Sequence, residues 1–151
     1  MNLFDNTLRD GGNVVGHGFS EELTKSIIGG LLNAGIKDIE MGNCKGLGAY
    51  GKLGAQKCPS DETYFEILQP YLPQGRIGMF MLAKCADKEN IRKAKEAGLN
   101  FLRVGANASD GQGAVKAVEM VKEANNIPAA IGCGISTPEQ AKKMASISDG
   151  A

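Results

Sequence analysis

The feature that most limits the fold of this chain is a regular alternation of short apolar runs with amphipathic stretches. Five apolar runs each precede a stretch whose apolar residues recur every three or four positions, as in a helix. The runs cover residues 2–8, 36–43, 76–84, 99–107 and 127–135. Buried strands that alternate with helices are typical of βα units around a parallel sheet. We therefore expect an α/β fold of about five βα units.

The first predicted helix has clear signals at both ends and an unusual pair of residues inside. Ser20 is a good N-cap, and Gly35 is a typical residue just after a helix. Gly29 and Gly30 lie within the helix, where each costs about 1 kcal/mol relative to alanine. This cost predicts close packing of the helix against the sheet at the two glycines.

The length of the chain limits how many units it holds. A closed barrel of eight βα units takes about 250 residues, and this chain has 151 residues, of which 42% are apolar. We expect one domain, 1–151, folded as a partial TIM barrel similar to half a barrel, with a stub of a sixth unit at its end. An open flavodoxin-like sheet is the alternative. Exposed edges of a parallel sheet favour self-association, so a homo-oligomer is expected.

Charge and composition exclude several classes of partner. Lys plus Arg and Asp plus Glu number 17 each, so no net positive charge attracts nucleic acid. No apolar run is long enough to cross a membrane, and the first residues do not resemble a signal peptide, which predicts a cytoplasmic protein without a membrane partner. The 4 cysteines form no CxxC pair, so reduced thiols are expected. Cys44 and Cys58 flank a glycine-rich loop and either are reactive or pack as small residues.

The motif Arg9-Asp10-Gly11-Gly12 follows the first apolar run. In a parallel barrel the carboxyl end of each strand lies at the rim where active sites form. Two interpretations are open at this point: an exposed ion pair that closes a strand, or a site for a metal ion and a substrate. Glu40, near the end of the second run, would lie at the same rim.

Two further features lie near the expected rim. Arg103 falls inside the fourth apolar run, and an arginine that points inward needs a partner, either an anionic ligand or Glu40 across the sheet. The loop 45–56 contains four glycines and is interpreted either as a lid over a substrate or as a disordered insertion.

Four segments resemble a known enzyme group. They are DNTLRDGGN, AGIKDIEMGN, GLGAYGKLGAQ and AGLNFLRVGANAS. Together they cover about residues 2–124, and they resemble the barrel metal-dependent lyases and aldolases with an Asp-Arg-Glu signature, in particular the 4-hydroxy-2-oxovalerate aldolases. The resemblance implies that Asp10 binds Mn²⁺ or Mg²⁺, and that Arg9 holds a pyruvate-like 2-oxo acid and stabilises its enolate.

The same resemblance suggests roles for neighbouring residues. Gly11 and Gly12 would let the backbone approach the ligand. Glu40 would hold Arg9 in place or act in the site itself. Asn43 would form a hydrogen bond with the ligand or simply end the strand.

Two departures from this family bear on catalysis. The family places a histidine soon after the Arg-Asp-Gly run, whereas this chain has Asn13, and His17 is the only histidine available to transfer a proton. The family also binds its metal through two histidines on a later strand, and this sequence has no such pair. We therefore expect a partial barrel derived from a lyase and incomplete for catalysis as a single chain. The alternative is a non-catalytic scaffold, chimeric or truncated, that self-associates.

The last part of the chain resembles a different barrel. The segment IPAAIGCGISTPEQAKKMASISDGA is similar to the phosphate-loop region of the tryptophan synthase alpha subunit, over about residues 115–151. We place the change between the two resemblances after residue 124, which divides the chain into parts 1–124 and 125–151. In the second part Gly132, Gly134 and Ser136 would bind a phosphate ligand through backbone N–H groups. Alternatively, Ser136 or Thr137 is only the cap of the last helix.

Overall fold

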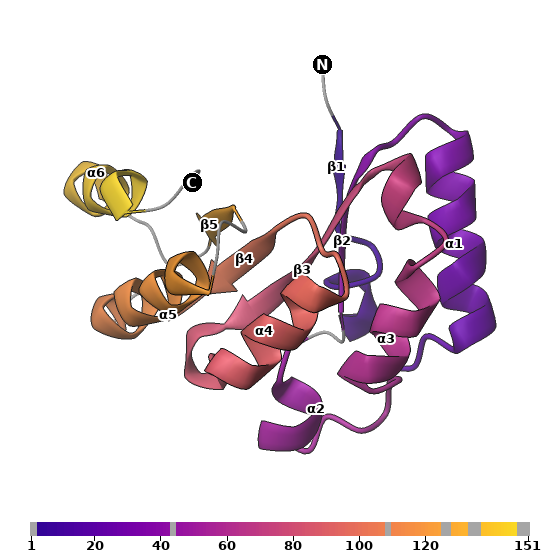
Figure 1. Ribbon diagram of the computed structural model, residues 1–151, viewed down its shortest axis with the longest axis horizontal. Helices are drawn as coiled ribbons and strands as arrows, with labels where there is room; N and C mark the ends of the chain where they lie inside the picture. The colour runs from indigo at the N-terminus through magenta and orange to yellow at the C-terminus, as the bar shows by residue number, and fades with distance from the viewer. Residues whose placement is uncertain (1–2, 43–44, 108–109, 125–127, 133–136, 148–151) are drawn as a thin grey trace.

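The computed structural model describes residues 3–42, 45–107, 110–124, 128–132 and 137–147 (Figure 1). Its strands are β1 (Phe4–Asp5), β2 (Asp38–Met41), β3 (Arg76–Leu82), β4 (Leu102–Gly105) and β5 (Ala129–Gly132). Its α-helices are α1 (Glu21–Asn33), α2 (Ala49–Lys52), α3 (Asp61–Leu68), α4 (Lys88–Glu96), α5 (Gly111–Glu123) and α6 (Pro138–Ile147). Short 3₁₀ turns cover η1 (Gly11–Asn13), η2 (Leu72–Gln74) and η3 (Ala83–Cys85).

The strands form one five-stranded parallel sheet in the order β1-β2-β3-β4-β5. Each strand therefore pairs with the next one along the chain. A flavodoxin-like sheet reverses its strand order at a switch point, which this sheet does not. The open-sheet alternative is wrong, and the expected partial TIM-barrel arrangement of five βα units is confirmed. No helix among the described residues is long and apolar enough to cross a membrane.

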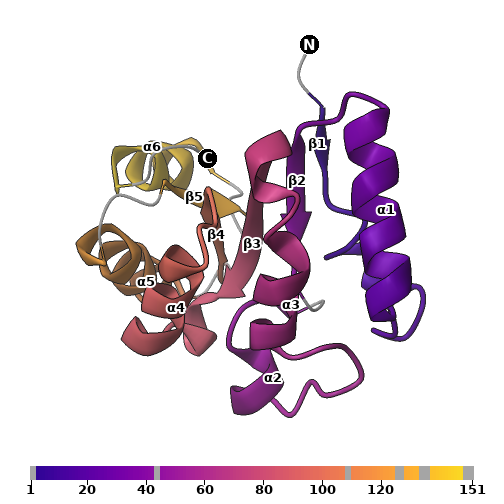
Figure 2. The same ribbon diagram turned by 45° about the vertical axis from the view of Figure 1, so that its right-hand side comes forward.

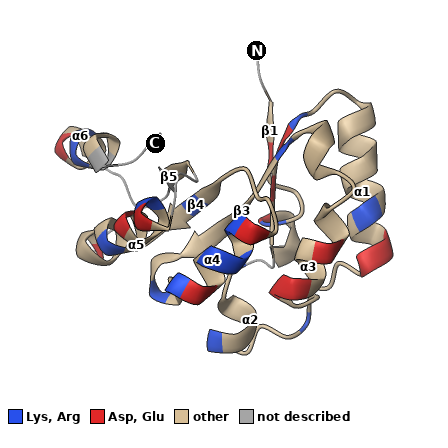
Figure 3. Ribbon diagram, viewed as in Figure 1, with Lys and Arg blue, Asp and Glu red and all other residues tan. Residues whose placement is uncertain are grey.

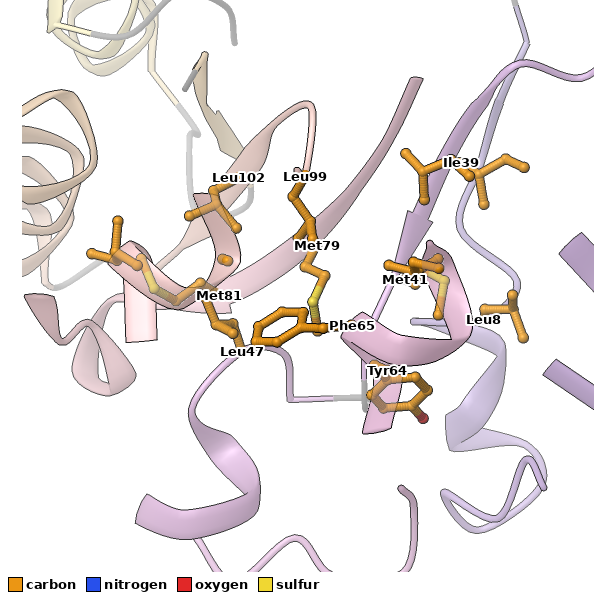
Figure 4. Close-up of a cluster of buried hydrophobic side chains, with 14 of the residues drawn as sticks. Leu8, Ile39, Met41, Leu47, Tyr64, Phe65, Met79, Met81, Leu99 and Leu102 are labelled. Atoms are coloured by element: carbon orange, nitrogen blue, oxygen red, sulfur yellow. The ribbon is translucent and has the colours of Figure 1, made fainter. Parts of the chain in front are cut away.

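The helices pack along one face of the sheet and form its core there (Figures 1 and 2). Alternate strand residues contribute to this core because successive side chains of a strand point to opposite faces. Ile39, Met79 and Leu102 are examples, all without measurable exposure. Figure 4 shows Met79 and Met81 beside Phe65 of α3. The alternation of side chains along each strand therefore gives the sheet one apolar face, which the helices cover.

The intervening strand residues face away from the helices. Glu40, Phe80 and Arg103 alternate with the core residues on β2, β3 and β4, and none of them belongs to the helix-covered core. Glu40 pairs with Gly78 in the sheet, and Phe80 pairs with Arg103. We call this second face the charged face.

The helix ends follow the signals in the sequence. The Ser20 hydroxyl accepts a hydrogen bond from the backbone N–H of Leu23, as expected of the cap of α1. The Thr137 hydroxyl accepts from Gln140 N–H while the Gln140 side chain accepts from Thr137 N–H, so Thr137 caps α6. Acidic residues occupy the first turns of α1 and α3, where the helix dipole favours negative charge (Figure 3).

The first strand is shorter than expected. We expected a strand over 2–8, whereas β1 ends at Asp5. The Asp5 carboxylate accepts hydrogen bonds from the backbone N–H and hydroxyl of Thr7, and the Asn6 carbonyl accepts from the N–H groups of Arg9 and Asp10. These bonds turn the chain out of the strand before the Arg9-Asp10 pair.

The expected packing of the two helical glycines is wrong. A Cβ atom added at Gly29 or Gly30 would meet no atom within 4 Å. The side of α1 that packs on the core carries Ile28, which is fully buried, and not the two glycines. Nothing in the packing explains why glycine stands at these positions.

The glycine-rich loop is neither an open lid nor a disordered insertion in its described part. The Leu47 N–H donates to the Phe80 carbonyl over 2.8 Å, and the Leu47 side chain is 1% exposed. Gly46 has a φ of 83° and lies so close to β3 that an added Cβ would be 2.2 Å from the Phe80 oxygen. Glycine is required there, and this part of the loop is fixed to the strand that carries Phe80.

Candidate functional site

A buried carboxylate is the centre of the charged face. The Glu40 side chain has no exposed area, and its oxygens accept three hydrogen bonds from two arginines. Arg103 donates from Nε to Oε1 over 2.6 Å and from Nη2 to Oε2 over 2.7 Å. Arg9 donates from Nε to Oε2 over 2.9 Å. Glu40 therefore contacts both Arg9 and Arg103, and a role of Glu40 or Arg103 toward a ligand stays a prediction.

An aromatic ring completes this arrangement. The guanidinium carbons of Arg9 and Arg103 lie 4.7 and 5.0 Å from the centre of the Phe80 ring. Phe80 is itself only 5% exposed, so both cations interact with a ring that is largely shielded from water. We call Arg9, Glu40, Phe80 and Arg103 the Glu40 cluster.

Phe80 is a residue that sequence reasoning missed. The signal was present in RIGMFML, because a period of two that puts Met79 and Met81 in the core puts Phe80 on the opposite face. An aromatic residue on the face opposite the core, between Glu40 and Arg103 on the neighbouring strands, is a candidate partner for arginine.

Asp10 extends the cluster toward solvent. Its Oδ1 accepts a hydrogen bond from Arg9 Nη1 over 2.7 Å and one from Asn13 Nδ2 over 3.3 Å, and the side chain is 55% exposed. The described residues contain no group of three or more His, Cys, Asp or Glu side chains able to hold a metal ion. Asp10 supplies at most one ligand, so the described side chains do not fit a complete Mn²⁺ or Mg²⁺ site.

His17 lies outside the Glu40 cluster. Its backbone has a φ of 68°, and its N–H donates to the Gly12 carbonyl over 2.7 Å. The Nδ1 atom is buried without a hydrogen-bond partner among the described residues, and the His17 carbonyl accepts from the Cys58 thiol. No hydrogen bond to Arg9 or Asp10 supports His17 as the proton-transfer group, and this role stays a prediction.

The remaining predicted site residues divide into two groups. Gly11 and Gly12 form the turn η1 directly after Asp10, and Gly132 ends β5 at the same carboxyl edge of the sheet. Their contacts with a ligand stay predictions. Asn43, Gly134 and Ser136 lie outside the described residues.

A second buried carboxylate was not anticipated. Asp61, the first residue of α3, is 8% exposed, and its Oδ2 accepts a hydrogen bond from Gly48 N–H over 2.8 Å. Its Oδ1 is buried with no hydrogen-bond partner among the described residues. Burial raises the pKa of Asp61 to about 6, although the Gly48 bond acts in the opposite direction.

Cys58 and Cys85 are both buried. The pKa of Cys85 is raised by its burial, which disfavours the thiolate, and Cys58 donates its thiol hydrogen to the His17 carbonyl. Of the two readings of Cys58, packing is the one that its burial favours.

The parallel strands in chain order and the single layer of helices define a segment of a (βα) barrel, with the charged face opposite the helices. Curated proteins similar to this chain include several 4-hydroxy-2-oxovalerate aldolases. Over 123 residues the chain is 27% identical to the 4-hydroxy-2-oxovalerate aldolase of Carboxydothermus hydrogenoformans, covering 82% of this chain and 37% of that enzyme. Over 110 residues it is 32% identical to 4-hydroxy-2-oxovalerate aldolase 4 of Paraburkholderia xenovorans, covering 73% of this chain and 32% of the relative.

The tail matches a second family. The model of the tryptophan synthase alpha chain family matches residues 96–151. Among solved structures, tryptophan synthase from M. tuberculosis has a TM-score of 0.58 at 18% identity, covering 84% of this chain and 44% of that chain. A tryptophan synthase alpha subunit from Pyrococcus furiosus has a TM-score of 0.57 at 12% identity, covering 84% and 48%. At such identities these structures show a shared fold alone.

Both predicted resemblances are confirmed by these comparisons. The match to the tryptophan synthase alpha chain begins earlier than expected, at residue 96 and not near 115. The two resemblances therefore overlap, and the curated relatives include one matched over 97% of this chain, at 24% identity, in Moorella thermoacetica. The chain spans between 32% and 44% of the length of the curated relatives described here.

Proposed function

We propose that the charged face binds the carboxylate and keto oxygen of a small 2-oxo acid through Arg9, as part of a carbon–carbon lyase. The observation that carries this proposal is the set of hydrogen bonds that the Arg9 guanidinium makes. Its Nε and Nη1 are engaged by Glu40 and Asp10, while its Nη2 donates to no described acceptor. The similar curated proteins are 4-hydroxy-2-oxovalerate aldolases, which supports a 2-oxo acid as the ligand.

The chemistry of this proposal follows from the guanidinium group. Arg9 is planar, always charged and largely buried at 11% side-chain exposure, so its field is weakly screened. A carboxylate or enolate oxygen that meets Nη2 gains a charge-assisted hydrogen bond. The same bond stabilises the negative charge that develops on the keto oxygen when a carbon–carbon bond breaks. His17 is proposed, on its place in the loop alone, as the group that moves the proton.

Titration calorimetry with oxalate, which mimics the enolate of pyruvate, tests this proposal. We expect Arg9→Gln to weaken oxalate binding by about tenfold to a hundredfold, because one charge-assisted hydrogen bond is lost. Arg76→Gln is the matched control, because Arg76 of β3 also forms an ion pair with a carboxylate, that of Asp38 on the neighbouring strand β2. No oxalate binding by the unaltered protein, or equal loss in both variants, contradicts the proposal.

The role of Asp10 in metal binding is tested in a separate arm. If Asp10 is one ligand of Mn²⁺ or Mg²⁺, Mn²⁺ strengthens oxalate binding, and Asp10→Asn removes this gain. Asp38→Asn is the control, because Asp38 likewise accepts from an arginine, over 2.6 Å. If Mn²⁺ still strengthens oxalate binding in Asp10→Asn, the metal ion is bound by other groups and the role of Asp10 is rejected.

A second candidate function is a phosphate site at residues 132–136. The match of residues 96–151 to the tryptophan synthase alpha chain family favours it, and Gly132 ends β5 at the same sheet edge as the Arg9 turn. A phosphate ester should raise the melting temperature more than chloride at equal ionic strength. Equal stabilisation by both salts rejects this site.

We propose that the parts 1–124 and 125–151 belong to one (βα) domain, and that this domain self-associates. β1 is an edge strand; its Phe4 is 47% exposed, and Leu3 just before it is 56% exposed. Sedimentation velocity measures the assembly state, and a monomer at all concentrations rejects self-association. The scaffold alternative predicts the same dimer without oxalate binding.

A further inference from the structure

Arg103 holds Glu40 at two points. Its Nε and Nη2 reach different oxygens of the carboxylate, over 2.6 and 2.7 Å. Two parallel bonds of this kind fix the plane of a carboxylate, which a single bond does not. Since Arg103 stands on β4 and Glu40 on β2, the contact spans β3 between them.

Arg9 depends on the orientation that Glu40 takes. Only one atom of Arg9, Nε, reaches Glu40, and it meets the same Oε2 that Arg103 Nη2 contacts. The other described hydrogen-bond acceptor of the Arg9 guanidinium, Asp10, is 55% exposed and so restrains it weakly. The Phe80 ring supports the guanidinium from one side without fixing the direction of its N–H groups. Without the bonds from Arg103 the Glu40 carboxylate would rotate, and Arg9 would lose its fixed direction.

Arg103 also changes the charge around Arg9. One buried carboxylate is shared by two guanidinium groups, so the pairing with Glu40 leaves positive charge in the cluster. Both guanidinium groups lie against Phe80, which is 5% exposed and keeps water away from them. Asp10 is a second carboxylate beside Arg9, but its charge is screened by water because the side chain is 55% exposed. The buried part of the cluster therefore still attracts an anion next to the Nη2 of Arg9.

We propose that Arg103 is a positioning residue, which orients Arg9 through Glu40 for binding a 2-oxo acid anion. The part that concerns the anion rests on the proposed function. The part that concerns the orientation of Arg9 does not, because it is visible in the protein without a ligand. Arg103 itself is not required to touch the ligand.

The orientation of Arg9 is measured by NMR of arginine Nε–H groups, with the Arg9 signal assigned from its loss in Arg9→Lys. In the unaltered protein we expect a protected Nε–H for Arg9. In Arg103→Met we expect its exchange with solvent to be about tenfold faster while the backbone spectrum stays that of a folded protein. Arg76→Met, which removes an arginine that lies 5.9 Å from the Phe101 ring centre, should leave the Arg9 signal unchanged.

Arg103→Lys separates orientation from charge and is the second variant if Arg103→Met folds poorly. Lysine keeps the positive charge but cannot make the two parallel bonds. We expect Arg103→Lys to leave Arg9 as poorly protected as Arg103→Met does. Full protection of Arg9 in Arg103→Lys, or an unchanged signal in Arg103→Met, overturns the proposal.

Oxalate titration of the same variants tests the second part. We expect oxalate binding to weaken about tenfold in both Arg103 variants and to stay unchanged in Arg76→Met. Unchanged binding in the Arg103 variants, with Arg9 protection lost, overturns the link to the ligand. If the unaltered protein binds no oxalate at all, the proposed function fails, while the NMR result still decides whether Arg103 positions Arg9.

Discussion

Among the residues that the structure describes, two carboxylates are buried, and their surroundings differ sharply. Glu40 has no exposed area and accepts three hydrogen bonds from Arg9 and Arg103 on the charged face. Asp61 is 8% exposed, its Oδ2 accepts a hydrogen bond from Gly48 N–H, and its Oδ1 has no partner among the described residues. Glu40 thus has cations as direct partners, whereas the described hydrogen-bond partner of Asp61 is an uncharged backbone group.

The two faces of the sheet account for this difference. Glu40 stands on the face away from the helices, where neighbouring strands bring Arg103 and Phe80 alongside it. Asp61 begins α3 on the helix-covered side of the sheet, and Lys93, a cation that acts on its charge, has its ammonium 3.1 Å from Glu62. A buried acid without its own cation holds its proton more tightly, so the pKa of Asp61 is raised to about 6.

The largest expected effect comes from removing the charge of Glu40. Glu40→Gln leaves two guanidinium groups without their buried counter-charge, and we expect the free energy of unfolding to fall by about 3 to 5 kcal/mol. Glu62→Gln is the control, because Glu62 is in an exposed pair and should change stability by less than about 1 kcal/mol. Urea denaturation at pH 7.5 measures both, and equal losses would mean that burial does not distinguish the two acids.

The next effect has the opposite sign and depends on pH. The pKa of Asp61 rises from 3.8 to about 6 on folding, so the folded protein binds this proton more tightly than the unfolded chain does. Its contribution is therefore most favourable at low pH and is lost as pH rises from about 4 to 6, by about 3 kcal/mol. Asp61→Asn keeps an acceptor for Gly48 and removes this loss.

Urea denaturation at pH 4 and pH 7.5 measures the prediction for Asp61. We expect Asp61→Asn to gain stability over the unaltered protein between the two pH values. Asp87→Asn is the control of opposite sign, because hydrogen bonds from Asn90 and Glu89 N–H lower the pKa of Asp87. Its carboxylate stabilises the fold above pH 4, and that contribution is lost as the pH falls. Identical pH profiles for the unaltered protein and Asp61→Asn would show that Asp61 is not the titrating group.

The fold could be predicted from the sequence because its signals are local. The period of the apolar residues identified the βα units, and Ser20 and Thr137 marked helix starts through side chains that bond within their own turn. The predicted end of β1 was wrong because hydrogen bonds of Asp5 and Asn6 compete with those of the sheet. The pattern of apolar residues does not reveal such bonds. The predicted close packing of the α1 glycines was wrong because helix propensity gives the energetic cost of a residue in a helix and carries no information on its contacts.

The site was predictable only where strand alternation determines it. Arg103 and Glu40 were considered as partners because both fall on the same side of a parallel sheet, and the structure confirms their contact. Asp61 was missed because its burial depends on the loop 45–56 folding back on α3, a contact between segments that no local pattern records. His17 and the phosphate-loop residues stay predictions.

A smaller effect is expected from the glycine that contacts Asp61. Gly48 has a φ of 80°, and a Cβ there would lie 2.9 Å from the Asn90 side-chain nitrogen and 3.0 Å from the Cys85 carbonyl. We expect Gly48→Ala to lower the free energy of unfolding by about 1 to 2 kcal/mol. Gly51→Ala, where a Cβ meets nothing within 4 Å, should be neutral or slightly stabilising. Thermal unfolding compares them, and equal stability would mean that the Gly48 turn adapts without moving Asp61.

The smallest expected effect comes from removing the charge of Lys93. It tests whether Lys93 balances the negative charge of Asp61 in the way that Arg103 balances that of Glu40. Lys93 lowers the pKa of Asp61, yet this influence ranks below burial, and its side chain is 40% exposed. Lys93→Gln should therefore raise the pKa of Asp61 only slightly further and change stability by less than about 0.5 kcal/mol. Carboxyl ¹³C NMR titration of Asp61 measures the pKa directly, with Lys88→Gln as the control because Lys88 is paired with Glu123. A rise as large as the one caused by burial would mean that Asp61 has a cation of its own, and the contrast with Glu40 would then be one of degree.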